Sequence, residues 1–133
     1  MIHKTNAARL LDKLKIEYEI LEYEVDLNDL SAVHVAASTK QDIKQIYKTI
    51  VCQCEPKNFV VACLQGDLEL DLKALAHACG AKRCELINLK DLEKITGYIR
   101  GGCSPLAMKK HFATFIDERA KEQEYVLVSA GVR

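Results

Sequence analysis

The chain has 133 residues, of which 49% are hydrophobic, and its 19 basic and 19 acidic side chains give a formal charge of zero. This length suits one globular domain with a single core, so we expect residues 1–133 to form one domain. The charge balance lacks the overall basic character of a dedicated nucleic-acid-binding protein, so any contact with tRNA or DNA would have to be local and sensitive to salt. No apolar run reaches the ~18 to 20 residues of a membrane-spanning helix. The composition therefore predicts a domain that binds neither DNA nor membranes.

Six cysteines stand at positions 52, 54, 63, 79, 84 and 103. Several lie inside apolar runs, where a free thiol behaves as a small hydrophobic group. The N-terminus shows no secretory signal pattern, so we expect free thiols and a cytoplasmic location. Cys52-x-Cys54 and Cys79-x4-Cys84 lack a second close pair with zinc-type spacing, and the histidines are scattered singly. The sequence therefore predicts no metal site and no cofactor.

Capping residues and side-chain periodicity predict short helices and strands that alternate along the chain. Thr5 suits the N-cap of an amphipathic helix that places Leu11 and Leu14 on one face. Residues 17–25 are rich in Tyr and Ile and predict a strand. A second helix is expected to begin near Ser31.

The rest of the chain continues this alternation. The further expected elements, in chain order, are a hairpin of strands at 46–54 and 59–65, a helix capped by Asp71 and closed by Gly80, a strand at 84–87, a helix capped by Asn88, and strands at 112–116 and 125–129. Many short strands with interspersed helices predict an α+β fold, with flanking helices around a mixed, largely antiparallel sheet or barrel.

Residues 96–106 form a candidate ligand-facing loop. This stretch holds three glycines and a Ser104-Pro105 step between two apolar segments. Gly101 and Gly102 have no side chains to screen their backbone N–H groups. Pro105 fixes one φ angle and biases Ser104 toward an extended conformation. Composition alone also allows a plain turn between two elements, as most clusters of glycine and proline are.

Lys48 interrupts an otherwise apolar strand face. Period-two alternation places it with Ile46, Ile50 and Cys52. A buried ammonium is costly unless it is paired or hydrogen-bonded. Two interpretations stand: Lys48 reaches the rim of an edge strand, or it points into a polar pocket where a ligand supplies acceptors.

Several separated motifs together resemble one known family. These motifs are YKTIV at 47–51, LQGD at 64–67, LDLKALA at 70–76, TGY at 96–98, GGCSPL at 101–106, IDE at 116–118 and VSAG at 128–131. In this order, and over almost the whole chain, they are similar to the YbaK family. Its members are small trans-editing proteins that resemble the insertion domain of bacterial prolyl-tRNA synthetase. The branch that this chain resembles most is that of the Cys-tRNA deacylases, which clear cysteine from mischarged Cys-tRNA(Pro).

The resemblance implies an aminoacyl-tRNA deacylase, with the 3′ end of an aminoacyl-tRNA as its partner and prolyl-tRNA synthetase as a second one. It assigns Lys48 to hold the terminal aminoacyl-adenosine and Gly101 to line the amino-acid pocket. Gly102, Ser104 and Pro105 would shape the same loop. Backbone N–H groups of this loop would bind the ester carbonyl oxygen as charge develops on it.

Tyr23 and Cys103 each keep two interpretations. Tyr23 matches a family tyrosine near the pocket, but it would also pack in an ordinary strand. Cys103 lies in the glycine loop between Gly102 and Ser104, a position suited to a nucleophile, although a small apolar residue would fit the same position equally well. No histidine lies in the glycine loop or beside Lys48 in sequence, so no local pattern points to a Cys–His or Ser–His pair, and we expect the protein to offer no nucleophile of its own. For the Cys-directed branch the resemblance implies that the substrate's own thiol attacks its ester.

The C-terminus departs from the family pattern. Relatives continue past a Ser-x-Gly-x-Arg segment into a strand, an acidic pocket residue and a terminal helix, whereas this chain ends at Arg133. We therefore expect the C-terminal strand and helix to be absent and a sheet edge to be open. Two alternatives follow: water-driven deacylation of another small aminoacyl-tRNA such as Ala-tRNA, or an inactive relative that binds tRNA or a synthetase.

Overall fold

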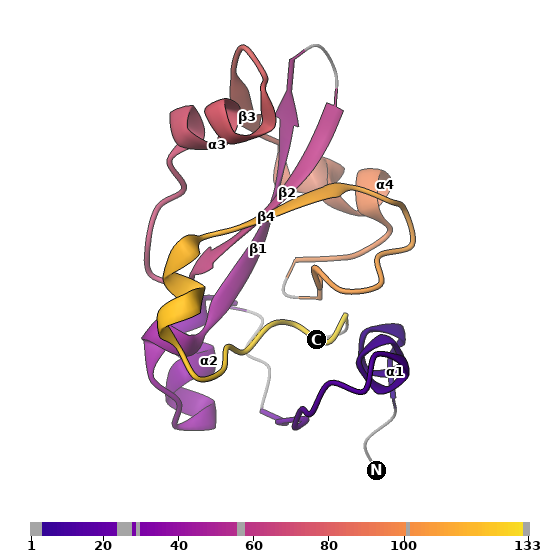
Figure 1. The fold of residues 1–133 in the computed structure, drawn as a ribbon, viewed down its shortest axis with the longest axis vertical. Coiled ribbons are helices and arrows are strands. Elements are labelled where there is room, and N and C mark those ends of the chain that lie inside the picture. The colour runs from indigo at the N-terminus through magenta and orange to yellow at the C-terminus, as the bar shows by residue number, and fades with distance from the viewer. Residues whose placement is uncertain (1–3, 24–27, 29, 56–57, 101, 132–133) are drawn as a thin grey trace.

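A computed structural model describes residues 4–23, 28, 30–55, 58–100 and 102–131. The helices are α1 (Asn6–Lys13), α2 (Ala32–Thr39), α3 (Leu72–Cys79) and α4 (Leu92–Thr96), and the strands are β1 (Tyr47–Cys54), β2 (Asn58–Gln65), β3 (Cys84–Leu86) and β4 (Ala113–Ile116). Short 3₁₀ turns lie at η1 (Ile43–Gln45), η2 (Leu89–Asp91) and η3 (Glu118–Glu122). Within these ranges no helix has the length and apolar character needed to cross a membrane. The β1–β2 hairpin runs through the molecule, with α3 and β3 near one end and α1 and α2 near the other (Figure 1).

The four strands form one mixed sheet in the order β3-β1-β2-β4. β1 pairs antiparallel with β2 over its whole length, from Tyr47 opposite Gln65 to Cys54 opposite Asn58. It pairs with β3 only over its last three residues, whereas β4 runs parallel to β2. The edge strands β3 and β4 do not pair with each other in the described part of the chain. The predicted α+β fold is therefore confirmed, and its sheet is open rather than closed into a barrel.

Side-chain caps begin α1, α2 and α3 where the sequence predicts them, whereas the expected cap Asn88 begins the η2 turn and α4 starts at Leu92 without a side-chain cap. Thr5, Ser31 and Asp71 each accept a hydrogen bond from the backbone N–H three residues further on, over 3.3, 3.2 and 3.0 Å. Each bond satisfies one N–H of the first turn that has no partner inside the helix. Gly80 closes α3 with a φ of 71°, a left-handed conformation that glycine adopts without strain.

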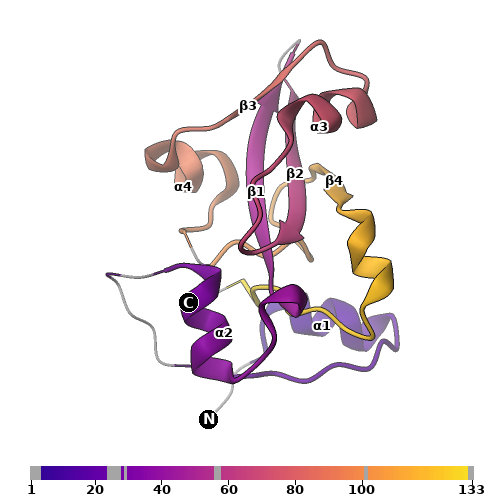
Figure 2. The same ribbon diagram turned by 90° about the vertical axis from the view of Figure 1, so that its left-hand side faces the viewer.

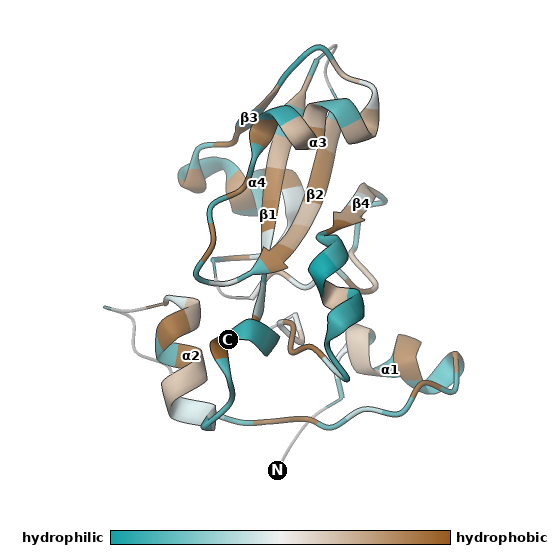
Figure 3. Cartoon of the chain, turned by 60° about the vertical axis from the view of Figure 1, so that its left-hand side comes forward, coloured by the Kyte–Doolittle hydropathy of each residue, from teal (hydrophilic) through white to brown (hydrophobic). Residues whose placement is uncertain are grey.

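The hairpin carries a hydrophobic core on each face. The α3-side core contains Cys52, Cys54, Val60, Ala62, Leu75, Ala76 and Cys84. The α4-side core contains Tyr47, Val51, Val61, Cys63, Leu92 and Cys103. Successive residues of a strand point to opposite faces, so the alternation along β1 and β2 divides their side chains between the two cores. Accordingly, α3 and α4 lie on different sides of the hairpin (Figure 2), and the strands between them are largely hydrophobic (Figure 3).

Two of the expected strands do not form. Residues 17–23 contain no strand, and residues 24 and 25 lie outside the described residues. Leu14 follows the end of α1 and is 56% exposed, so it does not join the buried face of that helix. The expected strand at 125–129 is reduced to one bridge, between Leu127 and Ile46. A β-rich segment becomes a strand only where a neighbouring strand completes its hydrogen bonds, and the described residues of neither segment have such a neighbour along their length.

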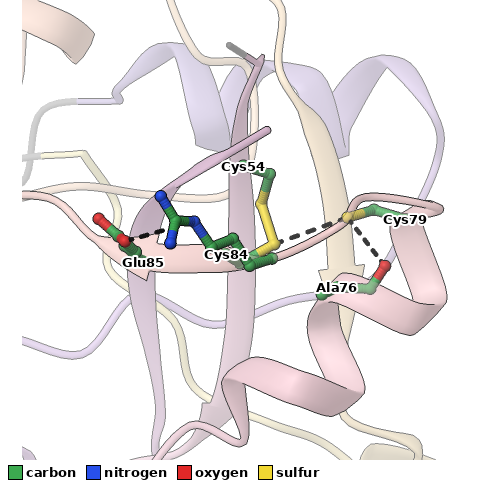
Figure 4. Close-up of a disulfide and its surroundings, with 6 residues drawn as sticks. Cys54, Ala76, Cys79, Cys84 and Glu85 are labelled. Carbon is green, nitrogen blue, oxygen red and sulfur yellow. Dashed lines mark hydrogen bonds and ion pairs between the residues drawn. A yellow bond between two sulfur atoms is a disulfide. The ribbon is translucent and has the colours of Figure 1, made fainter. Parts of the chain in front are cut away.

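Cys54 and Cys84 are joined by a disulfide (Figure 4). The antiparallel register of β1 on β3 sets these two residues directly opposite each other. The expectation of free thiols is therefore wrong for this pair, while Cys52, Cys63, Cys79 and Cys103 are free. The two partners are 30 residues apart in the chain, so local spacing did not reveal their contact.

Candidate functional site

A cavity of about 1750 Å³ lies beside the first half of β1. β3 reaches β1 only at Cys52, and no other described strand pairs with the edge of residues 48–50. Side chains of α1, of the segment that follows it, of α2 and of residues 124–130 enclose the space around this edge. Among its lining residues are Tyr23, Ala32, Lys48, Thr49, Gly66, Arg100 and Cys103.

Lys48 places a positive charge on the wall of this cavity. It is half-buried and stands opposite Leu64 of β2. Alternation assigns its side chain to the same face of β1 as Ile50 and Cys52, as the sequence predicts. Within the described ranges Lys48 makes no salt bridge. Its ammonium can therefore donate to acceptor atoms of a bound molecule.

The backbone next to Lys48 offers a second donor. Across the same edge of β1, the Tyr47 N–H donates to the Leu127 carbonyl over 2.9 Å, and the Ile87 N–H donates to the Val51 carbonyl over 3.5 Å. In an antiparallel strand alternate residues direct their backbone groups to the same side, so the N–H of Thr49 faces this edge too. No backbone acceptor among the described residues takes it. Adjacent residues thus present an ammonium and an N–H on one wall.

The glycine loop contributes to the cavity only in part. Gly102, Ser104 and Pro105 are not among its described lining residues. The Gly102 N–H donates to the Ile99 carbonyl over 2.9 Å. The Ser104 hydroxyl accepts the N–H of Leu106 over 3.2 Å and is 2% exposed. These polar groups shape the loop and are not presented to a ligand in this conformation.

Arg100, Cys103 and Leu106 are the described loop residues that reach the cavity, and Cys103 is 6% exposed. Burial raises the pKa of its thiol above the ordinary value. Since the thiolate is the nucleophilic form, a thiol held protonated at neutral pH is a poor nucleophile. Gly101, the position expected to line the amino-acid pocket, lies outside the described residues.

Tyr23 is half-buried and lines the same cavity as Lys48. The described residues on its N-terminal side form no strand, so packing within a strand does not account for its position. The described lining also carries charges of both signs, namely Lys48 and Arg100 against Glu17, Glu19, Glu22 and Glu124. A ligand with both anionic and cationic groups suits such a cavity.

Gly66 has a structural role that the sequence did not reveal. It follows β2 in the turn below the cavity, where its N–H donates to the Ile46 carbonyl over 2.8 Å. A methyl group on Gly66 would lie 2.1 Å from the Cβ of Ala32, the first residue of α2. The missing side chain therefore allows α2 to pack against the hairpin and close this part of the cavity. A glycine directly after a strand is the only local signal of this contact.

The fold and this cavity define a small α+β domain with a candidate ligand-binding cavity beside one edge of β1. Residues 28–133 match the model of the aminoacyl-tRNA editing domain family. The chain belongs to this family, and the resemblance predicted from its motifs is confirmed.

Individual relatives agree with this assignment. One relative is an Enterococcus faecalis protein named "Putative Cys-tRNA(Pro)/Cys-tRNA(Cys) deacylase EbsC", which is 46% identical over 130 residues. The match covers 98% of this chain and 79% of that protein. A second relative is "Proline--tRNA ligase" of Brachyspira hyodysenteriae, which is 28% identical over 105 residues. The match covers 79% of this chain and 17% of that protein. The fold of this chain resembles "Crystal structure of a putative trans-editing enzyme for prolyl tRNA synthetase", with a TM-score of 0.70 and 20% identity over 82% of this chain and 68% of that one.

The contact between Gly66 and α2 yields a stability prediction. Gly66→Ala should lower the free energy of unfolding by about 1–3 kcal/mol, because the new methyl group overlaps Ala32. Ala32→Gly removes the opposing methyl group, so the double variant should lose less than the sum of the two single variants. Urea unfolding of the four proteins measures this coupling. Additive losses would show that the two residues do not touch.

Proposed function

We propose that this protein is a trans-editing aminoacyl-tRNA deacylase that removes cysteine from mischarged Cys-tRNA(Pro). The observation that carries the proposal is Lys48, a half-buried cation without a salt bridge among the described residues, on the wall of a cavity. Because the chain belongs to the aminoacyl-tRNA editing family, the ligand proposed for this cation is an aminoacyl-tRNA, which is rich in hydrogen-bond acceptors. The name of the Enterococcus relative supports the choice of cysteine.

The cavity suits the 3′-terminal aminoacyl-adenosine of a charged tRNA. Ribose hydroxyls, the ester and the adjoining phosphates offer acceptors to the Lys48 ammonium and the Thr49 N–H. Charge-assisted hydrogen bonds of this kind are about twice as strong as neutral ones. The carboxylates of the lining complement the α-ammonium of the aminoacyl group. We assign Tyr23 to the same binding surface, and Gly101, Gly102, Ser104 and Pro105 to the loop that shapes it.

The bond-breaking step uses the thiol of the substrate. Its sulfur attacks the carbonyl carbon of its own ester, a carbon–sulfur bond forms, and the bond from that carbon to the ribose oxygen breaks. The thiol proton passes to the leaving ribose oxygen. The protein holds sulfur and carbonyl close together, and Lys48 and the Thr49 N–H stabilise the developing oxyanion. Discrimination then comes from chemistry, since alanyl and prolyl esters lack this nucleophile.

The proposal includes a partner and a place of action. A prolyl-tRNA synthetase is the proposed partner, supported by the similarity of this chain to part of a proline–tRNA ligase. A formal charge of zero limits sequence-independent attraction to RNA, so a synthetase that already holds the tRNA would raise the local substrate concentration. The proposed location is the cytoplasm, where tRNA is charged, and the proposed unit is the single domain of residues 1–133.

Lys48→Ala should reduce the deacylation of Cys-tRNA(Pro) by about 10- to 150-fold, because a charge-assisted contact contributes ~1.5–3 kcal/mol. Lys48→Arg should retain part of the activity, since it keeps the charge but changes the donor geometry. Lys44→Ala is the matched control, because Lys44 is exposed and does not line the cavity. Release of labelled cysteine measures the rate, and circular dichroism checks the fold. Near-wild-type turnover by folded Lys48→Ala would overturn the assignment of Lys48.

The source of the nucleophile is tested with a second substrate. Replacing the cysteinyl ester by a seryl ester should slow deacylation by orders of magnitude, because a hydroxyl of similar size is a much weaker nucleophile. Cys103→Ala should keep nearly the full rate on the cysteinyl ester, since burial holds that thiol protonated. Comparable rates on both esters would instead indicate attack by water. Loss of activity in folded Cys103→Ala would indicate a protein nucleophile.

A further inference from the structure

Three cysteines converge at the end of β1 that lies away from the cavity. Cys54 ends β1, Cys84 begins β3 and Cys79 ends α3. Their sulfur atoms all lie within 4.8 Å of one another, and the Cys79 sulfur is 3.8 Å from that of Cys84 (Figure 4). None of the three lines the cavity. Any role of this cysteine cluster is therefore separate from the proposed deacylation.

The arrangement is a compact triangle rather than a line. A disulfide bond of about 2.05 Å followed in line by the 3.8 Å contact would place the outer sulfur atoms about 5.9 Å apart, beyond 4.8 Å. Cys79 is therefore not aligned behind the Cys54–Cys84 bond, as a thiolate that attacks Cys84 and displaces Cys54 would be. By contrast, three sulfur ligands each about 2.3 Å from one metal ion lie about 3.8–4.0 Å apart. The Cys79–Cys84 separation already has this value.

The surroundings favour a soft metal ion. Cys54 and Cys84 are buried in the α3-side core, next to Leu75 and Ala76. Within the described residues no histidine or carboxylate joins the three sulfur atoms. All-thiolate sites bind soft d¹⁰ ions such as Zn(II) and Cu(I), and not hard, oxygen-seeking ions.

A surface ion pair lies at the two strand ends. The Arg83 guanidinium binds the Glu55 carboxylate at 2.9 Å and lies 3.7 Å from that of Glu85. The Glu55 N–H also donates to the Arg83 carbonyl over 3.1 Å. The pairing of β1 with β3 and the backbone bond of Glu55 set Cys54 opposite Cys84 independently of the disulfide, whereas exposed ion pairs such as these add little.

We propose that Cys54, Cys79 and Cys84 form a thiolate site for one soft d¹⁰ metal ion once the disulfide is reduced. A dithiol reductant supplies two electrons and two protons to the Cys54–Cys84 bond and is itself oxidised to a disulfide. Metal binding then releases three thiol protons to the solvent and forms three metal–sulfur bonds. Cu(I) is satisfied by three such ligands, whereas Zn(II) takes a water in its fourth position. Disulfide and metal therefore exclude each other.

Metal titration of the reduced full-length protein tests this site. Zn(II) and Cu(I) are added separately, without oxygen, against a chromophoric competitor, and one equivalent of at least one ion should bind per chain. X-ray absorption at the metal edge should count three sulfur neighbours at about 2.3 Å. Cys79→Ser should weaken binding about tenfold or more. Cys63→Ala is the matched control, because Cys63 is a buried free thiol of the α4-side core, and it should bind as the wild type does.

Each outcome decides the proposal. Binding of one ion with three sulfur neighbours supports it and identifies the metal. Absence of binding by both ions, fewer than three sulfur neighbours, or equal affinity in Cys79→Ser would overturn it. If Cys79→Ser does not fold, the sulfur count on the wild-type protein still decides. Binding lost equally in Cys63→Ala would place the metal at a different group of thiols.

Discussion

The antiparallel pairing of β1 with β2 is the interaction on which the rest of the molecule depends. Its register, from Tyr47 opposite Gln65 to Cys54 opposite Asn58, fixes the face on which each side chain of the hairpin lies. A shift of one residue would exchange the two cores and move Lys48 to the α4 side. Both hydrophobic cores, and the position of the charge in the cavity, follow from this one register.

Along the edge of β1 that faces away from β2, the two ends of the strand have different surroundings. β3 pairs only with the last three residues of β1, and beyond the contact of Tyr47 with Leu127 the edge of residues 48–50 has no strand partner among the described residues. At these residues the backbone of Thr49 and the side chain of Lys48 meet a cavity. At the paired half the register on β3 brings Cys54 to Cys84, and the end of α3 adds Cys79. One strand thus serves a candidate binding site and a thiol cluster at opposite ends.

Local signals in the sequence predicted much of this fold, and long-range contacts account for what it missed. The caps Thr5, Ser31 and Asp71 act within one helical turn, so the sequence reveals them directly. The strand expected at 17–25 failed in its described part because strand formation needs a partner that local composition does not specify. Cys54 lies 30 residues before Cys84, so the spacing rules used for zinc sites, which considered Cys79-x4-Cys84 by itself, revealed neither the disulfide nor the approach of Cys54 to Cys79. Lys48 was identified because it breaks an apolar alternation, whereas Gly66 breaks no pattern and its contact with Ala32 was missed.

Deacylation of a matched set of charged tRNAs tests the proposed function most directly. The protein is incubated with one tRNA(Pro) carrying cysteine, alanine or proline, and the loss of each ester is followed against a reaction without protein. Rapid loss of the cysteinyl ester, with the alanyl and prolyl esters at the background rate, is the predicted result. Equal loss of the alanyl ester would contradict cleavage by the substrate thiol. Background rates for all three would contradict catalysis and leave a protein that only binds.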